Sequence, residues 1–354
     1  MPFSPAKRNG TLSGVAFVAL IATIATFLSG LPALKNLGIS PLVVGIVIGI
    51  VFANTMHHKM PTSWESGITF SAKKILRFAI VFYGFRITFQ QIGEVGLEGF
   101  LVSLIMLSST FVLGTWLGTK VFKMEEDTSL LTAAGASVCG AAAVLATEPV
   151  VKAEEHKTAI AVSMVVLFGT ISMFLYPVLY TTLMENPDSL LHMTGREFGI
   201  YVGGTIHEVA QVVAVPASIP GASEEMANSA VIVKMTRVIM IAPMLIVLGV
   251  YLSYKAKKTG GETSAVKLVI PWFAVYFIGV AGFNSLNLVP ENIVHWINEI
   301  DTFLLTIAMT ALGIGTRFAK FKGLGLAPVY TALSMFIWLV VAGFVITKFI
   351  CYAF

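Results

Sequence analysis

The sequence predicts an all-α, polytopic membrane protein. Of its 354 residues, 56% are hydrophobic and only 12% are charged, about half the charged share of an ordinary soluble domain. The apolar residues come in runs of about 18 to 25, the length that a helix needs to cross the hydrocarbon layer. The runs lack the alternating pattern of barrel strands. A soluble enzyme is therefore disfavoured, and we expect a single integral membrane domain over residues 1–354.

Eleven membrane spans are expected from the apolar runs. They lie near residues 12–30, 38–55, 73–89, 97–118, 129–150, 157–180, 197–215, 227–252, 268–286, 301–318 and 329–350. Helices are expected because lipid offers the backbone no hydrogen-bond partner. Residues 1–11 form a polar tail, and the run that follows has no small-residue cleavage site, so the first span is expected to be retained.

The basic residues predict the orientation of the chain. Fifteen fall in loops on one side: Lys7, Arg8, Lys59, Lys73, Lys74, Lys120, Lys123, Arg196, Lys255, Lys257, Lys258, Lys267, Arg317, Lys320 and Lys322. Four fall on the other side: Lys35, Lys152, Lys157 and Lys348. Cytoplasmic loops carry the excess of positive charge. The N-terminus is therefore predicted to be cytoplasmic and the C-terminus outside, with no basic face for nucleic acid.

Two weak internal echoes suggest a duplicated transporter fold. Residues 77–96 resemble residues 306–325, and these two copies are predicted to run in opposite directions. The segment starting GASVCGAAAV at Gly135 resembles the segment starting GGTIHEVAQV at Gly203, and these two are predicted to run in the same direction. We prefer the first echo because it is inverted.

Small residues in the middle of the fifth span have two interpretations. The segment 135–143 can be a packing face between helices, or a broken helix whose amides and half-helix N-terminus face an anion. On the second interpretation the candidate substrate-binding residues are Gly135, Ser137, Cys139 and Gly140. A candidate second break lies at Gly313, Gly315 and Thr316.

Two ionisable residues interrupt the seventh span. His207 and Glu208 lie in an apolar stretch, where a charged group costs roughly 2.5 to 3.5 kcal/mol to insert. His207 and Gln211 are four residues apart, so on a continuous helix they share a face and could bind one ligand. Glu208, with His207, is a candidate for coupling transport to an ion. Alternatively, the pair has only a structural role and holds helices together. A zinc site of the HExxH type needs histidine where Gln211 stands, so no metal is expected.

Two cations lie on one face of the eighth span. Lys234 and Arg237 are three residues apart and lie too deep to reach either surface easily. Glu208 could neutralise one of them, and snorkelling to a helix end is an alternative. The surplus charge would suit a small anion, and arginine is suited to oxyanions.

Two further charged residues lie near the ends of spans. Arg86 is expected near an outer edge, as an anchor or entrance residue. Asp301 is expected to cap the start of the tenth span in preference to relaying protons.

Several strings resemble one family. GASVCGAAAVLATEPVVKAEEHKTAIAV, TIHEVAQVVAV, KMTRVIMIAPM, PWFAVYFI and DTFLLTIAMTALG are similar to the YeiH-like family of bacterial inner-membrane proteins, also called the sulfate exporter family. The resemblance runs nearly end to end. It implies a multi-pass protein of the bacterial inner membrane, related to cation/proton antiporters and bile-acid symporters, with crossing discontinuous helices. It also leaves a homodimer open.

These observations predict a secondary transporter of a small anion, with sulfate or another sulfur-containing anion as the candidate. Lys234, Arg237, His207, Gln211 and the segment 135–143 would bind the anion, and H⁺ or Na⁺ would be the coupling ion. The alternative is a cation/proton antiporter of the Na⁺/H⁺ type that uses Glu208. An embedded enzyme would need a nucleophile with its base, and Cys139 with a distant His207 is a poor candidate, so neither catalysis nor a cofactor is expected.

Overall fold

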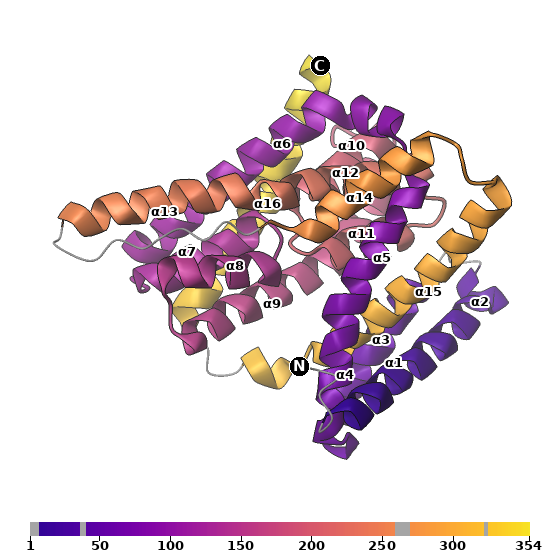
Figure 1. The fold of residues 1–354 in the computed structure, drawn as a ribbon. Helices are drawn as coiled ribbons and strands as arrows, with labels where there is room; N and C mark the ends of the chain where they lie inside the picture. The colour runs from indigo at the N-terminus through magenta and orange to yellow at the C-terminus, as the bar shows by residue number, and fades with distance from the viewer. Residues whose placement is uncertain (1–6, 36–39, 259–269, 322–324) are drawn as a thin grey trace. The chain divides into compact units, whose positions relative to one another are not determined.

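The structure is a computed structural model that describes residues 7–35, 40–258, 270–321 and 325–354. All regular secondary structure in these ranges is helical (Figure 1), as the sequence predicts. Six helices are long and apolar enough to cross a membrane: Arg8–Ser29, Phe89–Val121, Glu155–Met184, Glu224–Lys255, Glu291–Gly315 and Leu326–Ala353. The all-helical, polytopic fold class is therefore confirmed.

The chain forms two compact units that interleave in sequence. Unit 1 comprises Met1–Ile92, Val213–Ser223 and Phe273–Lys322, and unit 2 comprises the rest. Because each unit is built from several segments, neither is a continuous piece of chain, and the single integral domain stays a prediction. Residues 1–6 of the predicted tail, the starts of the predicted spans at 38 and 268, and Lys267 and Lys322 lie outside the described residues.

Unit 1 packs helices through small residues. Its helices are α1 (Arg8–Ser29), α2 (Pro32–Lys35), α3 (Pro41–Thr55), α4 (Glu65–Phe70), α5 (Leu76–Tyr83), α14 (Trp272–Ser285) and α15 (Glu291–Gly315), with a π-helical turn, η3 (Ser71–Ile75), joining α4 to α5 and a 3₁₀ turn, η4 (Gly84–Arg86), after α5. Helix α1 begins inside the predicted tail. A Cβ atom on Gly49 of α3 would lie 2.5 Å from the Thr310 carbonyl of α15. This close approach needs glycine.

The candidate second break at Gly313, Gly315 and Thr316 is wrong. Helix α15 runs without interruption to Gly315 and simply ends there, with the Thr316 amide donating to the Gly313 carbonyl. A Cβ atom on Gly313 would lie 3.0 Å from Cα of Gly49. Gly313 therefore serves close packing against α3, which is the other common use of small residues in membrane helices.

Unit 2 contains the broken helices. Its elements are α7 (Glu126–Ser137), α8 (Ala141–Val151), α9 (Glu155–Leu179), α10 (Gly195–Thr205), α12 (Glu224–Ile239), α13 (Ile241–Lys258) and α16 (Leu326–Ala353). Helices α6 (Phe89–Trp116) and α11 (Val209–Ala217) each lie partly in this unit. The predicted spans 129–150 and 197–215 thus each contain two short helices.

The first pair, α7 and α8, pack against each other as a re-entrant hairpin (Figure 1). Leu131 of α7 and Val144 of α8 pack in one cluster with Val165 of α9. Helices α7 and α9 begin at the same end of the unit, because Lys157 Nζ lies 2.7 Å from the Asp127 carboxylate. Since α8 ends only a few residues before α9 begins, the chain returns to the end from which α7 started, and the predicted span 129–150 does not cross.

The second pair, α10 and α11, enters from the opposite end of unit 2. Helices α10 and α12 run parallel, with Gly199 against Met226 and Gly203 against Ala230. The chain between them therefore returns to the end where α10 began. This end also holds η6 (Tyr180–Met184), the π-helical turn that follows α9, where the Met193 amide donates to the Met184 carbonyl. The last turns of α16 lie there too, where Lys348 pairs with Glu197. The predicted span 197–215 does not cross either.

The two hairpins form the inverted repeat of the fold. The first is α7 and α8 followed by α9, and the second is α10 and α11 followed by α12. Helices α9 and α12 run in opposite directions because their hairpins start from opposite ends. The repeat built by the structure is therefore the echo that pairs Gly135 with Gly203. The prediction that these two copies run in the same direction is wrong, because it took each hairpin for a crossing helix.

Candidate functional site

Lys234 and Arg237 lie at the centre of unit 2, where the two hairpin tips meet. Both side chains are on α12 and are completely buried. We call residues 138–140 the first tip and residues 206–208 the second tip. Lys234 Nζ donates to the carbonyl of Val138 in the first tip at 2.8 Å, and to the carbonyls of Ile206 and His207 in the second tip, both at 2.7 Å. One ammonium group therefore joins both tips.

Arg237 completes the end of the first half-helix. Its Nε donates to the Ser137 carbonyl at 2.6 Å and its Nη2 to the Ala136 carbonyl at 2.8 Å. The two preceding carbonyls, of Ala134 and Gly135, accept from the amides of Val138 and Gly140. All four carbonyls that a helix C-terminus leaves open thus have a donor. The helix can end in an apolar interior because a buried cation takes the place of the next turn.

The two cations also match the electrostatics of the breaks. The C-terminus of a helix carries a partial negative charge, which a nearby cation stabilises. The ends of α7 and α10 both point their carbonyls at Lys234 and Arg237, so much of the cost of burying two positive charges is offset by backbone dipoles. Compensation by the backbone is an alternative to neutralisation by Glu208 that the sequence did not suggest.

Glu208 lies at the start of α8. Its Oε1 is 3.4 Å from the Ala141 amide, at the positive N-terminus of that half-helix. Gly140 makes this approach possible, since its φ is +74° and a Cβ atom there would lie 2.5 Å from Cγ of Glu208. Glu208 is only partly buried. A carboxylate of the second tip therefore occupies the place where sequence analysis expected the α8 amides to hold a substrate anion.

His207 and Gln211 bring unpaired polar atoms to the second tip and to the helix that follows it. Both residues are buried, at 2% and 1% exposure, and His207 Nδ1 and Gln211 Nε2 have no hydrogen-bond partner. The Gln211 Oε1 accepts from the Glu208 amide at 3.1 Å, which fixes the side-chain amide. The expected shared helix face is wrong because α11 begins at Val209, so His207 belongs to the tip. A buried polar atom without a partner is costly, so these two atoms are candidates for contact with a ligand.

The predicted small residues have separate roles. Gly135 lets Val144 and Val165 approach α7, Ser137 offers its carbonyl to Arg237, Cys139 is a buried free thiol in the first tip, and Gly140 makes the turn. Sequence analysis missed Gly169 of α9, where a Cβ atom would lie 2.6 Å from Gln211 Nε2. It also missed the break after Thr205, although the Gly203-Gly204 pair beside it was a usable signal.

Arg86 belongs to unit 1. Its Nη2 donates to the Asn298 carbonyl at 2.6 Å and to Thr302 Oγ1 at 2.8 Å, and it lies 3.5 Å from the Asp301 carboxylate. Its entrance role stays a prediction. Asp301 does not cap a helix, because α15 begins ten residues earlier than the predicted span, at Glu291.

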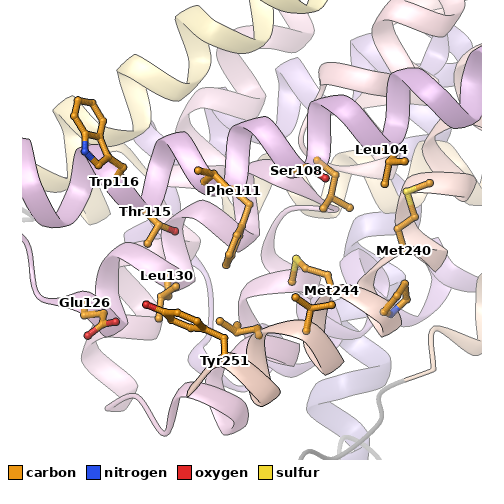
Figure 2. Close-up of a pocket in the computed structure, with 15 residues that line it drawn as sticks. Leu104, Ser108, Phe111, Thr115, Trp116, Glu126, Leu130, Met240, Met244 and Tyr251 are labelled. Atoms are coloured by element: carbon orange, nitrogen blue, oxygen red, sulfur yellow. The ribbon is translucent and has the colours of Figure 1, made fainter. Parts of the chain in front are cut away.

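An apolar groove of about 660 Å³ lies elsewhere in unit 2, between α6 and α13 (Figure 2). Phe111 and Trp116 of α6 line it, with Met244 and Tyr251 of α13. Its one charged lining residue is Glu126, which binds Lys255. Such a lining suits hydrocarbon better than an ion, so the tip cluster is the better candidate for a solute.

Comparisons with known proteins place the chain in a family. A family model described as conserved hypothetical protein 698 matches residues 13–332. The chain is 44% identical over 346 residues to a UPF0324 membrane protein of Pseudomonas putida, covering 98% of this chain and 95% of that protein. It is 45% identical over 344 residues to a UPF0324 membrane protein of Bordetella pertussis, covering 97% and 96%.

The name of a third relative also states a cellular location. The UPF0324 inner membrane protein YeiH of Escherichia coli K12 is 44% identical over 343 residues, covering 95% of each chain. No solved structure matches. These names state a membrane location and no solute or reaction. The resemblance found in the sequence strings is confirmed, as is the multi-pass inner-membrane location: the chain belongs to the UPF0324 family of bacterial inner-membrane proteins, which includes YeiH.

Proposed function

We propose that the protein is a secondary transporter of a small anion, with sulfate or another sulfur-containing oxyanion as the first candidate, and that the anion binds between the two hairpin tips. The observation that carries the proposal is the charge at this place. Lys234 and Arg237 supply two buried positive charges and Glu208 one negative charge where the two tips meet. The remaining positive charge favours an anion.

The structure changes the roles that the sequence suggested for these residues. The three Lys234 hydrogens are bound by carbonyls, so Lys234 would attract the anion through its field and not by direct contact. For an anion of unit charge about 5.5 Å from the ammonium group, and an effective dielectric constant of about 20, this attraction is about 3 kcal/mol. Direct hydrogen bonds would come from the unpartnered His207 Nδ1 and Gln211 Nε2.

Two hairpins that enter from opposite ends also suit alternating access. A site between their tips is separated from each end of the unit by one hairpin, so a small movement of either hairpin would open it to one side. Glu208 could then couple the cycle to H⁺ or Na⁺, because it is partly exposed and contacts the start of α8.

A cation/proton antiporter is the second candidate. The hydrogen bonds of Lys234 and Arg237 to the backbone also favour this candidate, because they give the two cations a structural role. Glu208 is then the partly exposed ionisable side chain at the tips. In that mechanism Glu208 would exchange Na⁺ for H⁺. Lys234 and Arg237 would only hold the tips together.

Binding and flux measurements would test the proposal. We expect sulfate or sulfite to raise the unfolding temperature of the purified protein above that in chloride at equal ionic strength. At a hundredfold excess over Kd, the bound anion should add about 3 kcal/mol to the free energy of unfolding. Gln211→Leu should abolish this shift, whereas Gln90→Leu, at an exposed glutamine, should preserve it. Proteoliposomes should show saturable uptake of labelled sulfate or sulfite.

The same vesicles separate the two candidates. A change of internal pH on adding Na⁺, without any dependence on anions and lost in Glu208→Gln, would favour the antiporter. Saturable anion flux that survives in both Lys234→Gln and Arg237→Gln would show that the buried cations do not form an anion site.

A further inference from the structure

A second buried ionisable group lies in unit 1, away from the tip residues in sequence. Asp301 is in the middle of α15, a helix long and apolar enough to cross the membrane, and its side chain is fully buried. Neither of its carboxylate oxygens has a hydrogen-bond partner. An ionised carboxylate in such surroundings is strongly disfavoured unless it is paired and hydrogen-bonded.

Arg86 does not provide that hydrogen bond in this structure. The two hydrogens of its Nη2 go to the Asn298 carbonyl and to Thr302 Oγ1, while the Asp301 carboxylate lies at 3.5 Å. Arg86 also lies over the Tyr83 ring, 5.1 Å from its centroid. The guanidinium thus hydrogen-bonds to Asn298 and Thr302, on either side of Asp301 in the sequence, and its contact with the carboxylate is a long ion pair without a hydrogen bond.

A third oxygen in the same place also lacks a donor. Asn298 Oδ1 is buried and has no hydrogen-bond partner. Asn298 and Asp301 are three residues apart on α15, so their side chains share a face of the helix. A neutral carboxylic acid carries its own donor. One proton on Asp301 would therefore supply Asn298 Oδ1 with a donor and remove the buried negative charge.

We propose that Asp301 is a reversible proton-binding site. In the protonated state the carboxyl group donates its hydrogen to Asn298 Oδ1, three residues away on the same helix. When the proton leaves to water beside Arg86, whose side chain is 28% exposed, the guanidinium turns from the Asn298 carbonyl to the carboxylate and forms a full ion pair. A proton fits this site better than a metal cation, because the part of the chain that the structure describes holds no group of three or more His, Cys, Asp or Glu side chains that could bind a metal.

The surroundings contain few other charges. Helix α15 packs against α1, α3, α4, η3, α5 and η4. Helix α1 has no ionisable residue after Arg8, and α3 has none. The titratable residues of the other packed elements are Glu65, Lys73, Lys74, Arg77, Tyr83 and Arg86. Of these, Arg86 faces Asp301, and Arg77 lies over the Phe273 ring. On α15 itself, Glu291, His295 and Glu299 are exposed.

Infrared spectroscopy of the full-length protein in detergent would test the proposal without any solute. We expect the C=O stretching band of a protonated carboxylic acid at neutral pH in the wild type and in Glu299→Gln, a matched exposed carboxylate on the same helix, and its loss in Asp301→Asn. Asn298→Leu should shift the band to higher frequency, because the acid loses its acceptor. Arg86→Gln should let the band persist to more alkaline pH.

A neutral-pH spectrum in which Asp301→Asn removes no such band would overturn the proposal. If Asp301→Asn fails to fold, the other two variants decide: a band that neither Asn298→Leu nor Arg86→Gln moves does not come from Asp301. This result would leave the proposed transport function untouched, because that function depends on the hairpin tips and is measured by anion binding and flux.

Discussion

The two re-entrant hairpins have the same backbone plan and opposite chemistry. Aligned on Gly135 and Gly203, the first tip has Cys139 and Gly140 where the second has His207 and Glu208. The helices that follow differ in the same way, because Gly169 of α9 corresponds to Arg237 of α12. Each hairpin tip thus serves as a frame, but the charged side chains come almost entirely from the second copy.

The two corresponding positions still face the opposite hairpin. Arg237 of α12 bonds to the end of the first half-helix, and Gly169 of α9 makes room for Gln211 beyond the second tip. The second copy thus supplies a hydrogen-bond donor at this position, whereas the first copy supplies room for a side chain. A duplicated fold can therefore keep its geometry while a single asymmetric site develops at its centre.

The largest expected effect comes from removing the group that joins the two tips. Lys234→Met leaves the carbonyls of Val138 and His207 without their donor, and leaves the Ile206 carbonyl with only the 3.4 Å hydrogen bond from Arg237 Nη1. We expect a loss of about 3 to 5 kcal/mol in the free energy of unfolding, as for other broken buried polar networks. Chemical unfolding of the purified protein in detergent measures it.

Lys348→Met is the matched control, because Lys348 is partly exposed and pairs with Glu197 near the end of the unit. Its loss should cost no more than about 1 kcal/mol. Equal losses in the two variants would contradict the view that Lys234 holds the tips.

Gly140→Ala should have an intermediate effect and separates backbone strain from the contact with Glu208. Gly140 and Gly221 have φ values of +74° and +72°, but a Cβ atom meets Glu208 only at Gly140 and finds nothing within 4 Å at Gly221. Both alanine variants should lose about 1 to 3 kcal/mol from strain. Gly140→Ala should lose more, and should also weaken anion stabilisation in the thermal-shift assay. If the two variants behave alike, the contact between the tips contributes nothing.

Hydropathy predicted the helical class and the buried ionisable residues, because an apolar run and a charge within it are visible in the sequence alone. It could not show that the segments 129–150 and 197–215 turn back, since a hairpin and a straight span have the same composition.

The distribution of basic residues contains a further indication of the two hairpins. With both hairpins folded back, Lys152 and Lys157 join the side rich in positive charge and Arg196 leaves it, so the loop count becomes sixteen against three. This is a cleaner separation than fifteen against four.

The break at Gly140 and the unbroken helix at Gly313 show why small residues alone are a poor guide. Both segments are rich in glycine and alanine. A helix can end inside an apolar core only where donors meet its last carbonyls. At Ser137 the donor is Arg237, from a helix a hundred residues away along the chain. At Gly313 the glycine instead meets the backbone of α3. The deciding partner lies far away in sequence.

The smallest expected effect lies at the start of the first hairpin, outside the buried site. Burial disfavours the charged form of Asp127, but hydrogen bonds from Lys157 and the Thr128 amide outweigh it, so the pKa of Asp127 lies below its ordinary value. A carboxylate with a lowered pKa stabilises the fold above its unfolded pKa, and this contribution is lost as the pH falls through the folded pKa. The start of α7 should therefore loosen in acid.

Lys157→Gln should remove most of this acid sensitivity with little loss of stability at neutral pH, because Asp127 loses the partner that holds it ionised. Hydrogen exchange in the first turn of α7, compared at neutral and acidic pH, measures the change. Lys120→Gln, an exposed lysine shortly before α7, should keep the wild-type response. Because α10 has its own capping box from Thr194 and Glu197, its first turn should not change in Lys157→Gln. A parallel change there would mean that the two hairpins unfold together and not as separate frames.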